Sequence, residues 1–182
     1  MTARGKAHEA LRCGTRAAHD RVDALFGRFD LARREDYADF LTAHAAALLP
    51  LEAALDRSGL DRIIDDWPQR RRACLLRADL DELGVAIPQT EAAALGEEPA
   101  SLLGALYVLE GSRMGGRLLA RSVGRGLPVR YLAAEQALAP WRHLLEMLER
   151  ALPDAASRDA AARSAAAAFD VFERAGRLVS KA

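Results

Sequence analysis

Apolar residues recur three or four positions apart along most of this 182-residue chain, the spacing of one face of an α-helix. A first helix is predicted from about residue 5 to residue 29, and a second from Arg34 to Arg57, where Pro50 is expected to bend it. Further helices are predicted over 70–83, from Pro99 to about Arg125, over 141–152 and from Pro153 to about Val179, with a short helix or loop over 61–68. The pattern therefore predicts an all-α fold.

The composition supports this prediction. Ala, Leu and Arg, which favour helices, number 39, 28 and 24 and make up half of the chain, whereas Val, Ile and Thr number only 14. No repeat and no long linker interrupts the pattern. We therefore expect a single domain over residues 1–182.

The charge balance disfavours several kinds of partner. The 26 basic and 26 acidic residues cancel, so no overall field attracts nucleic acid or an anionic membrane. The longest uncharged run, Phe40 to Leu51, is too short to span a membrane, and the N-terminus lacks an apolar leader. Two cysteines, Cys13 and Cys74, do not make a disulfide framework, so we expect both to be reduced thiols. We expect a cytoplasmic protein without nucleic-acid or membrane partners.

One polar group follows a single side of the first predicted helix. Arg12, Thr15, His19 and Asp23 lie at successive turns, next to an apolar stripe, so His19 is expected to face the interior margin rather than solvent. A neutral imidazole there could ligate a metal through one nitrogen while a carboxylate or a carbonyl holds the other. The alternative is a structural histidine at the core boundary, paired with Asp23.

Glycines interrupt an otherwise strong helical pattern later in the chain. Gly104, Gly111 and Gly115 fall near one azimuth, and Gly116 follows directly, although each interior glycine costs about 0.8–1.0 kcal/mol relative to alanine. A strip without Cβ atoms admits a close neighbour, and the adjacent pair permits a kink. The neighbour is either another helix or a flat ligand.

Together these two segments resemble the haem oxygenases. The resemblance rests on LRCGTRAAH from Leu11 to His19 and on GSRMGG from Gly111 to Gly116, supported by RADLDELG from Arg77 to Gly84. It looks closest to the compact bacterial members, including those associated with bacteriophytochromes. It implies a multi-helix bundle in which haem lies between the first helix and a glycine-kinked distal helix.

The resemblance also implies roles for individual residues. His19 corresponds to the proximal iron ligand, and the catalytic distal side corresponds to Gly111, Ser112 and Gly115. Further contacts with haem are implied on the first, distal and last two helices, for Arg12, Thr15, Asp23, Gly116, Arg142 and Phe169. Among these, Arg12 and Arg142 are the expected partners of the propionates, since an arginine clamps a carboxylate firmly.

The distal motif departs from the family at one position. Many members have an aspartate directly after the first distal glycine, whereas this chain has Ser112. A hydroxyl donates and accepts hydrogen bonds but supplies no fixed negative charge. The next residue, Arg113, is expected to point outward as a solvated charge.

The activity implied by the resemblance is oxidative cleavage of haem. Haem b serves as cofactor and substrate, dioxygen is the co-substrate, and the products are biliverdin, carbon monoxide and ferrous iron. A ferredoxin- or flavodoxin-type protein is the expected electron donor, and a bacteriophytochrome is a candidate acceptor of the product. Arg70, Arg71 and Arg72 are typical of a solvated helix start, with docking of an acidic electron donor as the lesser alternative.

Two other classes of function remain open from the sequence. One is a haem carrier that does not degrade its ligand, an interpretation that Ser112 favours. The other is a helical adaptor that keeps the fold and binds no haem, in which case His19 is a packed histidine.

Overall fold

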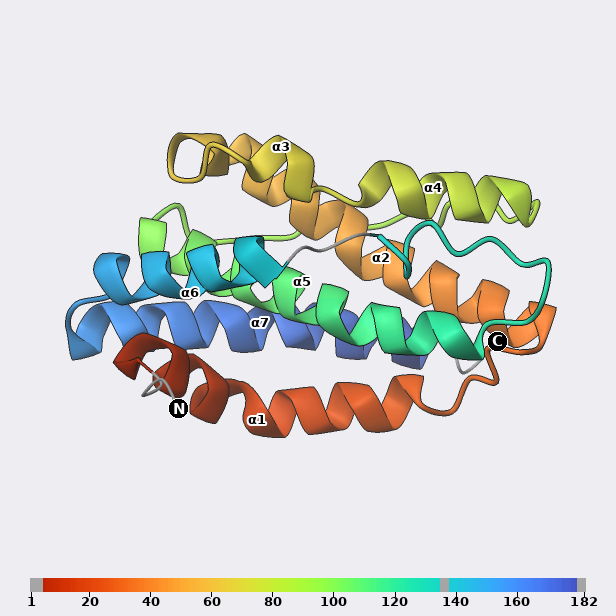
Figure 1. The fold of residues 1–182 in the computed structure, drawn as a ribbon, viewed down its shortest axis with the longest axis horizontal. Coiled ribbons are helices and arrows are strands. Elements are labelled where there is room, and N and C mark those ends of the chain that lie inside the picture. The colour runs from red at the N-terminus through yellow and green to blue at the C-terminus, as the bar shows by residue number, and fades with distance from the viewer. Residues whose placement is uncertain (1–4, 135–137, 180–182) are drawn as a thin grey trace.

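Helices account for all regular secondary structure in the computed structural model, which describes residues 5–134 and 138–179 (Figure 1). The α-helices are α1 (Lys6–Phe26), α2 (Arg34–Arg57), α3 (Trp67–Arg70), α4 (Ala73–Glu82), α5 (Pro99–Leu119), α6 (Leu138–Ala151) and α7 (Ala155–Val179). Two short 3-10 helices follow α2 and α5, namely η1 (Leu60–Arg62) and η2 (Ala120–Ser122). The expectation of an all-α fold is confirmed.

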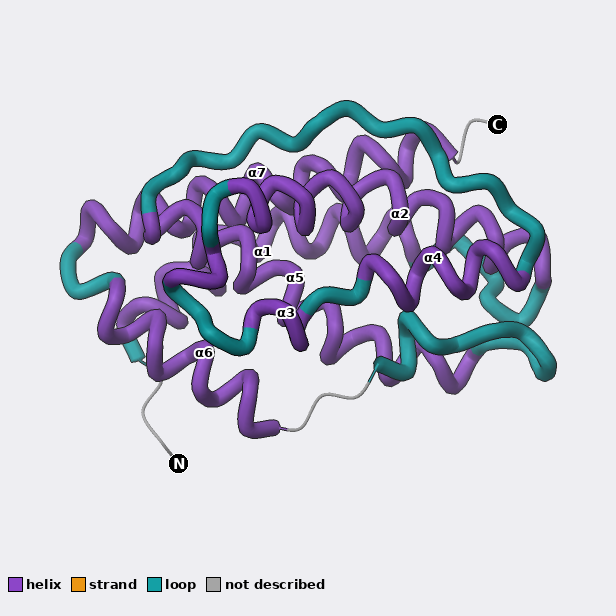
Figure 2. Tube along the Cα trace, turned by 90° about the horizontal axis from the view of Figure 1, so that it is seen from above, coloured by secondary structure: helices purple, strands orange, loops and turns teal. Residues whose placement is uncertain are grey.

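Helix α7 forms the centre of the bundle, because α1, α2 and α5 all pack along it. Figure 1 shows α1 along one edge of the molecule and α3 with α4 along the opposite edge. The segment 85–98 runs back along the length of the molecule from the end of α4 to the start of α5 (Figure 2).

Alanines let the central helices approach closely. Ala161, Ala165 and Ala168 of α7 are fully buried. A Cβ atom added to Gly104 of α5 would lie only 2.1 Å from the carbonyl oxygen of Ala161. The Ala-rich composition and this glycine therefore serve helix–helix packing.

Helix α2 lies in the core. An 18-residue window within it has a mean hydropathy of 1.2, so its length and composition alone would allow it to cross a membrane, but 67% of that window is buried inside the fold. Pro50 is buried within this helix, which continues to Arg57.

Several predicted helix boundaries are wrong by a few residues, and α1 ends at Phe26 rather than near residue 29. The predicted helix over 70–83 begins only at Ala73, because Arg71 is extended and the backbone N–H groups of Arg72 and Ala73 donate to the carboxylate of Glu52 at 2.8 and 3.0 Å. That carboxylate on α2 caps the new helix start. Helix α5 ends at Leu119 rather than near residue 125, and α6 begins at 138 rather than 141.

A carboxylate on α6 fixes the start of α1. Glu149 accepts hydrogen bonds from the backbone N–H groups of Ala7 and His8 at 3.1 and 3.0 Å. These N–H groups have no partner within the helix itself, so the carboxylate satisfies them and opposes the positive end of the helix dipole. The contact anchors the helix that carries His19.

Candidate functional site

A cavity of about 720 Å³ opens between the glycine-rich part of α5 and the polar side of α1. Phe40 and His44 of α2, Phe169 and Phe172 of α7, and the segment around Tyr131 complete its walls. This volume and a largely apolar lining suit a cofactor-sized ligand. Residues predicted from two distant sequence motifs therefore meet at one cavity.

His19 borders the cavity from the middle of α1. Its Nδ1 atom lies 3.1 Å from Oδ2 of Asp23, one turn further along the helix. Its ring also contacts that of Phe169 edge to face, with centroids 5.5 Å apart. The side chain is 56% exposed, more than expected for the interior margin, because it faces an open cavity. Since a carboxylate holds Nδ1, Nε2 is the nitrogen suited to ligate a metal.

The other predicted residues of α1 also line the cavity. Thr15 is buried, and its hydroxyl donates to the carbonyl of Leu11 at 2.7 Å, so it stabilises the helix locally. Arg12 is exposed at the cavity rim. Arg16, one turn further on, also lines the cavity and was missed by the sequence analysis, although its spacing of four from Arg12 placed it on the same side.

The glycines of α5 divide between the two roles left open by the sequence. A Cβ atom at Gly104 would collide with the backbone of α7, and one at Gly116 would lie 3.2 Å from the carbonyl oxygen of Leu132. In contrast, a Cβ atom at Gly111 or Gly115 would have nothing within 4 Å. Both of these glycines line the cavity, so helix packing does not explain them. Helix α5 runs without interruption through the Gly115–Gly116 pair.

Ser112 is held by a buried arginine from another part of the chain. Its hydroxyl donates to the carbonyl of Leu109 at 2.8 Å and accepts from the guanidinium of Arg72 at 2.7 Å. Arg72 also donates to Leu109 at 2.8 Å, and its guanidinium carbon lies 5.0 Å from the centroid of the Tyr131 ring. Arg72 is only 2% exposed and lines the cavity. A fixed positive charge therefore lies behind the serine.

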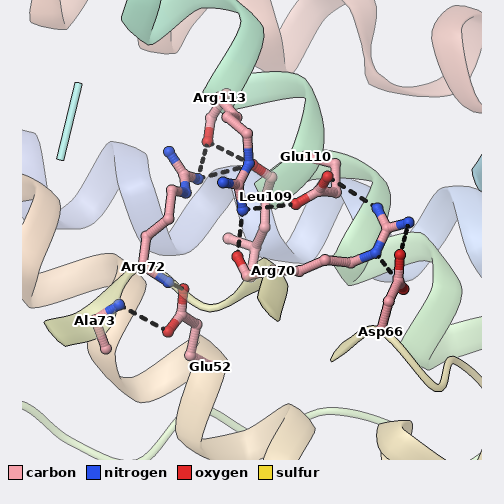
Figure 3. A network of polar contacts seen from close by, with 9 residues as sticks. Glu52, Asp66, Arg70, Arg72, Ala73, Leu109, Glu110 and Arg113 are labelled. Atoms are coloured by element: carbon pink, nitrogen blue, oxygen red, sulfur yellow. Dashed lines mark hydrogen bonds and ion pairs between the residues drawn. The ribbon is translucent and has the colours of Figure 1, made fainter. Parts of the chain in front are cut away.

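Buried ion pairs extend this arrangement away from the cavity (Figure 3). Arg70 donates to Glu110 at 2.9 Å and to Asp66 at 2.7 Å, and Arg113 donates to Glu110 at 3.1 Å and to the carbonyl of Arg70. These contacts tie α3 to the distal part of α5. The network holds the distal helix at a defined distance from α3 and α4.

Two predictions about charged residues are therefore wrong. Arg113 does not point outward: it is 6% exposed, and burial lowers the pKa of its guanidinium although Glu110 opposes the effect. Within the described residues, its Nε atom is buried without a hydrogen-bond partner. Arg70 and Arg72 are likewise buried rather than solvated, and only Arg71 is exposed, with its guanidinium 3.1 Å from Asp56. Arg70 and Arg72 are internal because acceptors from α2 and α5 surround them.

His44 is a cavity residue that the sequence analysis passed over. Its ring packs between Phe40 and Phe26, with centroids 4.1 and 4.6 Å away, and its Nδ1 lies 2.9 Å from the carbonyl oxygen of Phe40. Burial, assisted by the charge of Arg72, lowers the pKa of His44 to about 4. The imidazole is therefore neutral near pH 7. A carbonyl only accepts, so Nδ1 carries the proton and Nε2 is an acceptor.

The predicted residues on the last two helices differ in position. Phe169 of α7 lines the cavity beside His19. Arg142 of α6 is exposed and does not line the cavity, whereas its neighbour Trp141 does.

The cysteines do not form a metal site with other described residues. Cys13 lines the cavity as well, and both Cys13 and Cys74 are free thiols. Within residues 5–134 and 138–179, no three His, Cys, Asp or Glu side chains cluster to hold a metal ion.

Comparisons with known proteins agree on one family. The chain is 33% identical over 144 residues to the Xanthomonas campestris protein named heme oxygenase, a match that covers 76% of this chain and 87% of the relative. It is 27% identical to heme oxygenase PigA of Pseudomonas aeruginosa, over 87% of this chain and 85% of the relative. No family model matches the chain.

A solved structure supports the fold. The NO- and CO-bound heme oxygenase of Neisseria meningitidis superimposes with a TM-score of 0.81, over 97% of this chain and 92% of that one, at 22% identity. The two chains therefore share their helical architecture over nearly their whole lengths.

Proposed function

The chain belongs to the haem oxygenase family and is a haem-degrading enzyme, and we propose that the cavity between α1 and α5 is where haem binds and is cleaved. This proposal rests on one observation: a histidine and a glycine strip border the same cavity. His19, with Asp23 on its Nδ1, borders the same space as the Cβ-free surface of Gly111 and Gly115. Such a pair would provide a ligand for iron and a close-fitting helix for one planar group.

The residues at the cavity fit haem in three respects. Nε2 of His19 is the nitrogen that the Asp23 contact leaves for an iron atom. Apolar rings, including those of Phe40 and Phe169, suit the macrocycle. Exposed Arg12 and Arg16 at the rim suit its two propionates, which an arginine binds through charge-assisted hydrogen bonds. Arg142 would have to move toward the cavity to take the same role.

Bound haem supplies the iron that binds dioxygen and accepts electrons, while the protein supplies position and hydrogen bonding. On the proximal side, Asp23 orients the imidazole of His19 through its contact with Nδ1. On the distal side, Gly111 and Gly115 bring the helix backbone to the ligand without intervening side chains. The helix backbone would therefore lie close to a haem bound in the cavity.

Proton delivery in this chain relies on neutral and cationic groups. Ser112 is oriented by Arg72, which lines the cavity and places its positive charge beside the distal helix. Nε2 of His44 provides an acceptor in the same cavity. We assign these three side chains to holding water on the distal side, a role that a family aspartate takes elsewhere.

The wider setting follows from the same proposal. Residues 1–182 act as one domain in the cytoplasm, with haem b as cofactor and substrate and dioxygen as co-substrate. A ferredoxin- or flavodoxin-type protein supplies the electrons. Biliverdin, carbon monoxide and ferrous iron are the products, and a bacteriophytochrome is a candidate acceptor of the biliverdin.

Hemin titration followed by turnover tests the proposal. Purified protein is titrated with hemin, and ascorbate is then added in air with catalase present. A sharp Soret band that decays while biliverdin absorption grows is the expected result. A Soret band that persists unchanged contradicts the catalytic assignment and favours a haem carrier, and the absence of stoichiometric binding contradicts both.

A pair of histidine variants tests the ligand. His19→Ala is expected to lose the wild-type Soret spectrum and turnover, whereas His143→Ala, which changes an exposed histidine on α6, is expected to keep both. Wild-type spectra in His19→Ala would contradict the ligand assignment.

A further inference from the structure

The outer face of α5 at its C-terminal end carries exposed apolar side chains. Met114 and Leu118 are 47% and 66% exposed, although large apolar side chains in this bundle are mostly buried. They lie four residues apart, so they are neighbours on the helix surface. Arg117 of α5 and Arg121 of η2, which follows α5 directly, lie on the same side and are also exposed. Met114, Arg117, Leu118 and Arg121, spaced i, i+3, i+4 and i+7, are here called the α5 outer face.

This face lies in a strongly basic part of a neutral chain. Residues 111–134 contain five arginines and no aspartate or glutamate. Arg113 is buried and Arg130 pairs with Asp79 and Glu82, but Arg117 and Arg121 form no ion pair within the described part of the chain. A partner that seats here therefore meets an apolar centre beside two available positive charges.

The same helix separates this face from the cavity. Gly111, Gly115 and Leu119 line the cavity, while Met114 and Arg117 lie on the other side of α5. The thickness of one helix, about 10 Å, is all that lies between them. The cavity side of that helix carries no Cβ atom at Gly111 or Gly115, so the path from the α5 outer face to a ligand in the cavity is short.

We propose that the α5 outer face is the docking surface for a small acidic electron-transfer protein. This inference rests on the proposed function. In each transfer, the docked donor is oxidised by one electron and ferric haem in the cavity is reduced by one, and no bond forms or breaks. Acidic residues of the donor pair with Arg117 and Arg121, while an apolar contact at Leu118 holds the complex. Charge complementarity of this kind chiefly raises the rate of association, and small interfaces suit transient redox encounters.

The structure also rules out the surface that the sequence suggested for this role. Arg70 and Arg72 are buried, and the donors of Arg70 are engaged by Glu110 and Asp66. A partner cannot reach them without unfolding the contact between α3 and α5. Docking therefore falls to arginines that are exposed.

Electron delivery from a protein donor tests the proposal. The hemin-loaded protein is mixed under carbon monoxide, without oxygen, with a reduced plant-type [2Fe–2S] ferredoxin, and the ferrous CO Soret band is followed. Arg117→Glu/Arg121→Glu is expected to slow this reduction at least about tenfold at low ionic strength. The variant is also expected to lose most of the salt dependence that the wild type shows.

Control reactions separate docking from damage to the haem site. The double variant is expected to bind hemin normally and to turn over with ascorbate at the wild-type rate, since neither arginine lines the cavity. Arg57→Glu/Arg62→Glu carries the same change of charge at the corner between α2 and η1, at the far end of the molecule from the end of α5 (Figure 1). This control is expected to accept electrons from ferredoxin at close to the wild-type rate.

A third variant probes the apolar centre. Leu118→Gln is expected to raise the ferredoxin concentration needed for half-maximal rate and to leave the salt dependence intact. If ferredoxin reduces Arg117→Glu/Arg121→Glu at the wild-type rate, the proposal is overturned. That is also the result expected if this face binds a bilin acceptor instead. An equal loss in the control also overturns it. Failure of the wild type to bind hemin instead overturns the proposed function, and the docking surface falls with it.

Discussion

The guanidinium of Arg72 donates a 2.7 Å hydrogen bond to the hydroxyl of Ser112, forty residues further along the chain. The arginine is buried at the start of α4, with its backbone N–H held by Glu52. The serine that replaces a family aspartate therefore has a positive charge beside it. The polar character of the distal side depends on this pair rather than on the serine alone.

Removing Arg72 is expected to slow haem cleavage while leaving haem binding intact. Arg72→Met removes the donor that orients Ser112, so ascorbate-driven biliverdin formation should fall by about 10²-fold, the size typical for loss of one positioned proton-transfer group. Arg71→Met is the matched control, because Arg71 is exposed and contacts only Asp56 among the charged groups described. Equal rates in the two variants would contradict the role of Arg72.

Two glycine-to-alanine changes on α5 are expected to have opposite effects. Gly104→Ala places a Cβ atom 2.1 Å from the carbonyl oxygen of Ala161, so it should lower the free energy of unfolding by about 1–3 kcal/mol through overpacking. Gly111→Ala meets no atom within 4 Å and should raise it by about 0.8–1.0 kcal/mol through helix propensity.

Urea unfolding of the protein without hemin measures both changes. Hemin titration should then show weakened binding or altered spectra in Gly111→Ala, because the new methyl group enters the cavity. If Gly111→Ala gained stability and kept wild-type haem spectra and turnover, the close approach of α5 to haem would be contradicted.

The carboxylate behind His19 is expected to tune haem affinity. Asp23→Ala removes the partner of Nδ1 and should weaken hemin binding by about 10–100-fold, as loss of such a partner does at other metal-bound histidines. Both side chains are well exposed, so the stability of the protein without hemin should change little. Asp20→Ala, which removes another exposed cavity carboxylate, is the control. Comparable losses of hemin affinity in both variants would contradict a specific role of Asp23 and indicate a general effect of negative charge at the cavity.

His44 should make the stability of the haem-free protein depend on pH. Its pKa is lowered from 6.5 to about 4 in the folded state, so between these values the unfolded chain binds the proton and the folded protein does not. The contribution of neutral His44 to the free energy of unfolding is therefore complete above pH 6.5 and is lost as the pH falls toward 4. The free energy of unfolding changes by up to about 1.4 kcal/mol per pH unit in this range.

The variant His44→Leu isolates this effect. The raised pKa of Glu52 titrates in the opposite sense in both proteins, so it cancels in the difference between them. Urea unfolding across pH 4 to 7 should show the free energy of unfolding of the wild type falling relative to that of the variant as the pH is lowered. Parallel curves would show that His44 is not held neutral by burial.

The sequence predicted most of the helices because hydrophobic periodicity is a local property of the chain. The second helix was predicted at Arg34 to Arg57 and found there, and His19 and Asp23 were placed one turn apart with the carboxylate on one ring nitrogen. One boundary failed because a distant group intervened. The start of α4 moved to Ala73 because Glu52, from another helix, accepts the N–H groups there.

Charged side chains showed the limit of sequence reasoning most clearly. Arg113 and Arg70 were expected in solvent, and both are buried around Glu110. Each arginine taken alone favours water, and only the arrangement of acceptors from three segments makes burial favourable. His44 was overlooked for the same reason, because nothing next to it in the chain indicates a cavity.

The chain on its own thus carried the helical class, the polar side of the first helix and the glycine strip, all of which depend on residues within a few turns of one another. The division of that strip required the folded structure: Gly104 meets the backbone of α7, whereas Gly111 and Gly115 face open space. Burial and hydrogen bonding are set by groups that the chain brings together from far apart. Packing therefore decided which glycines serve the fold and which serve the cavity.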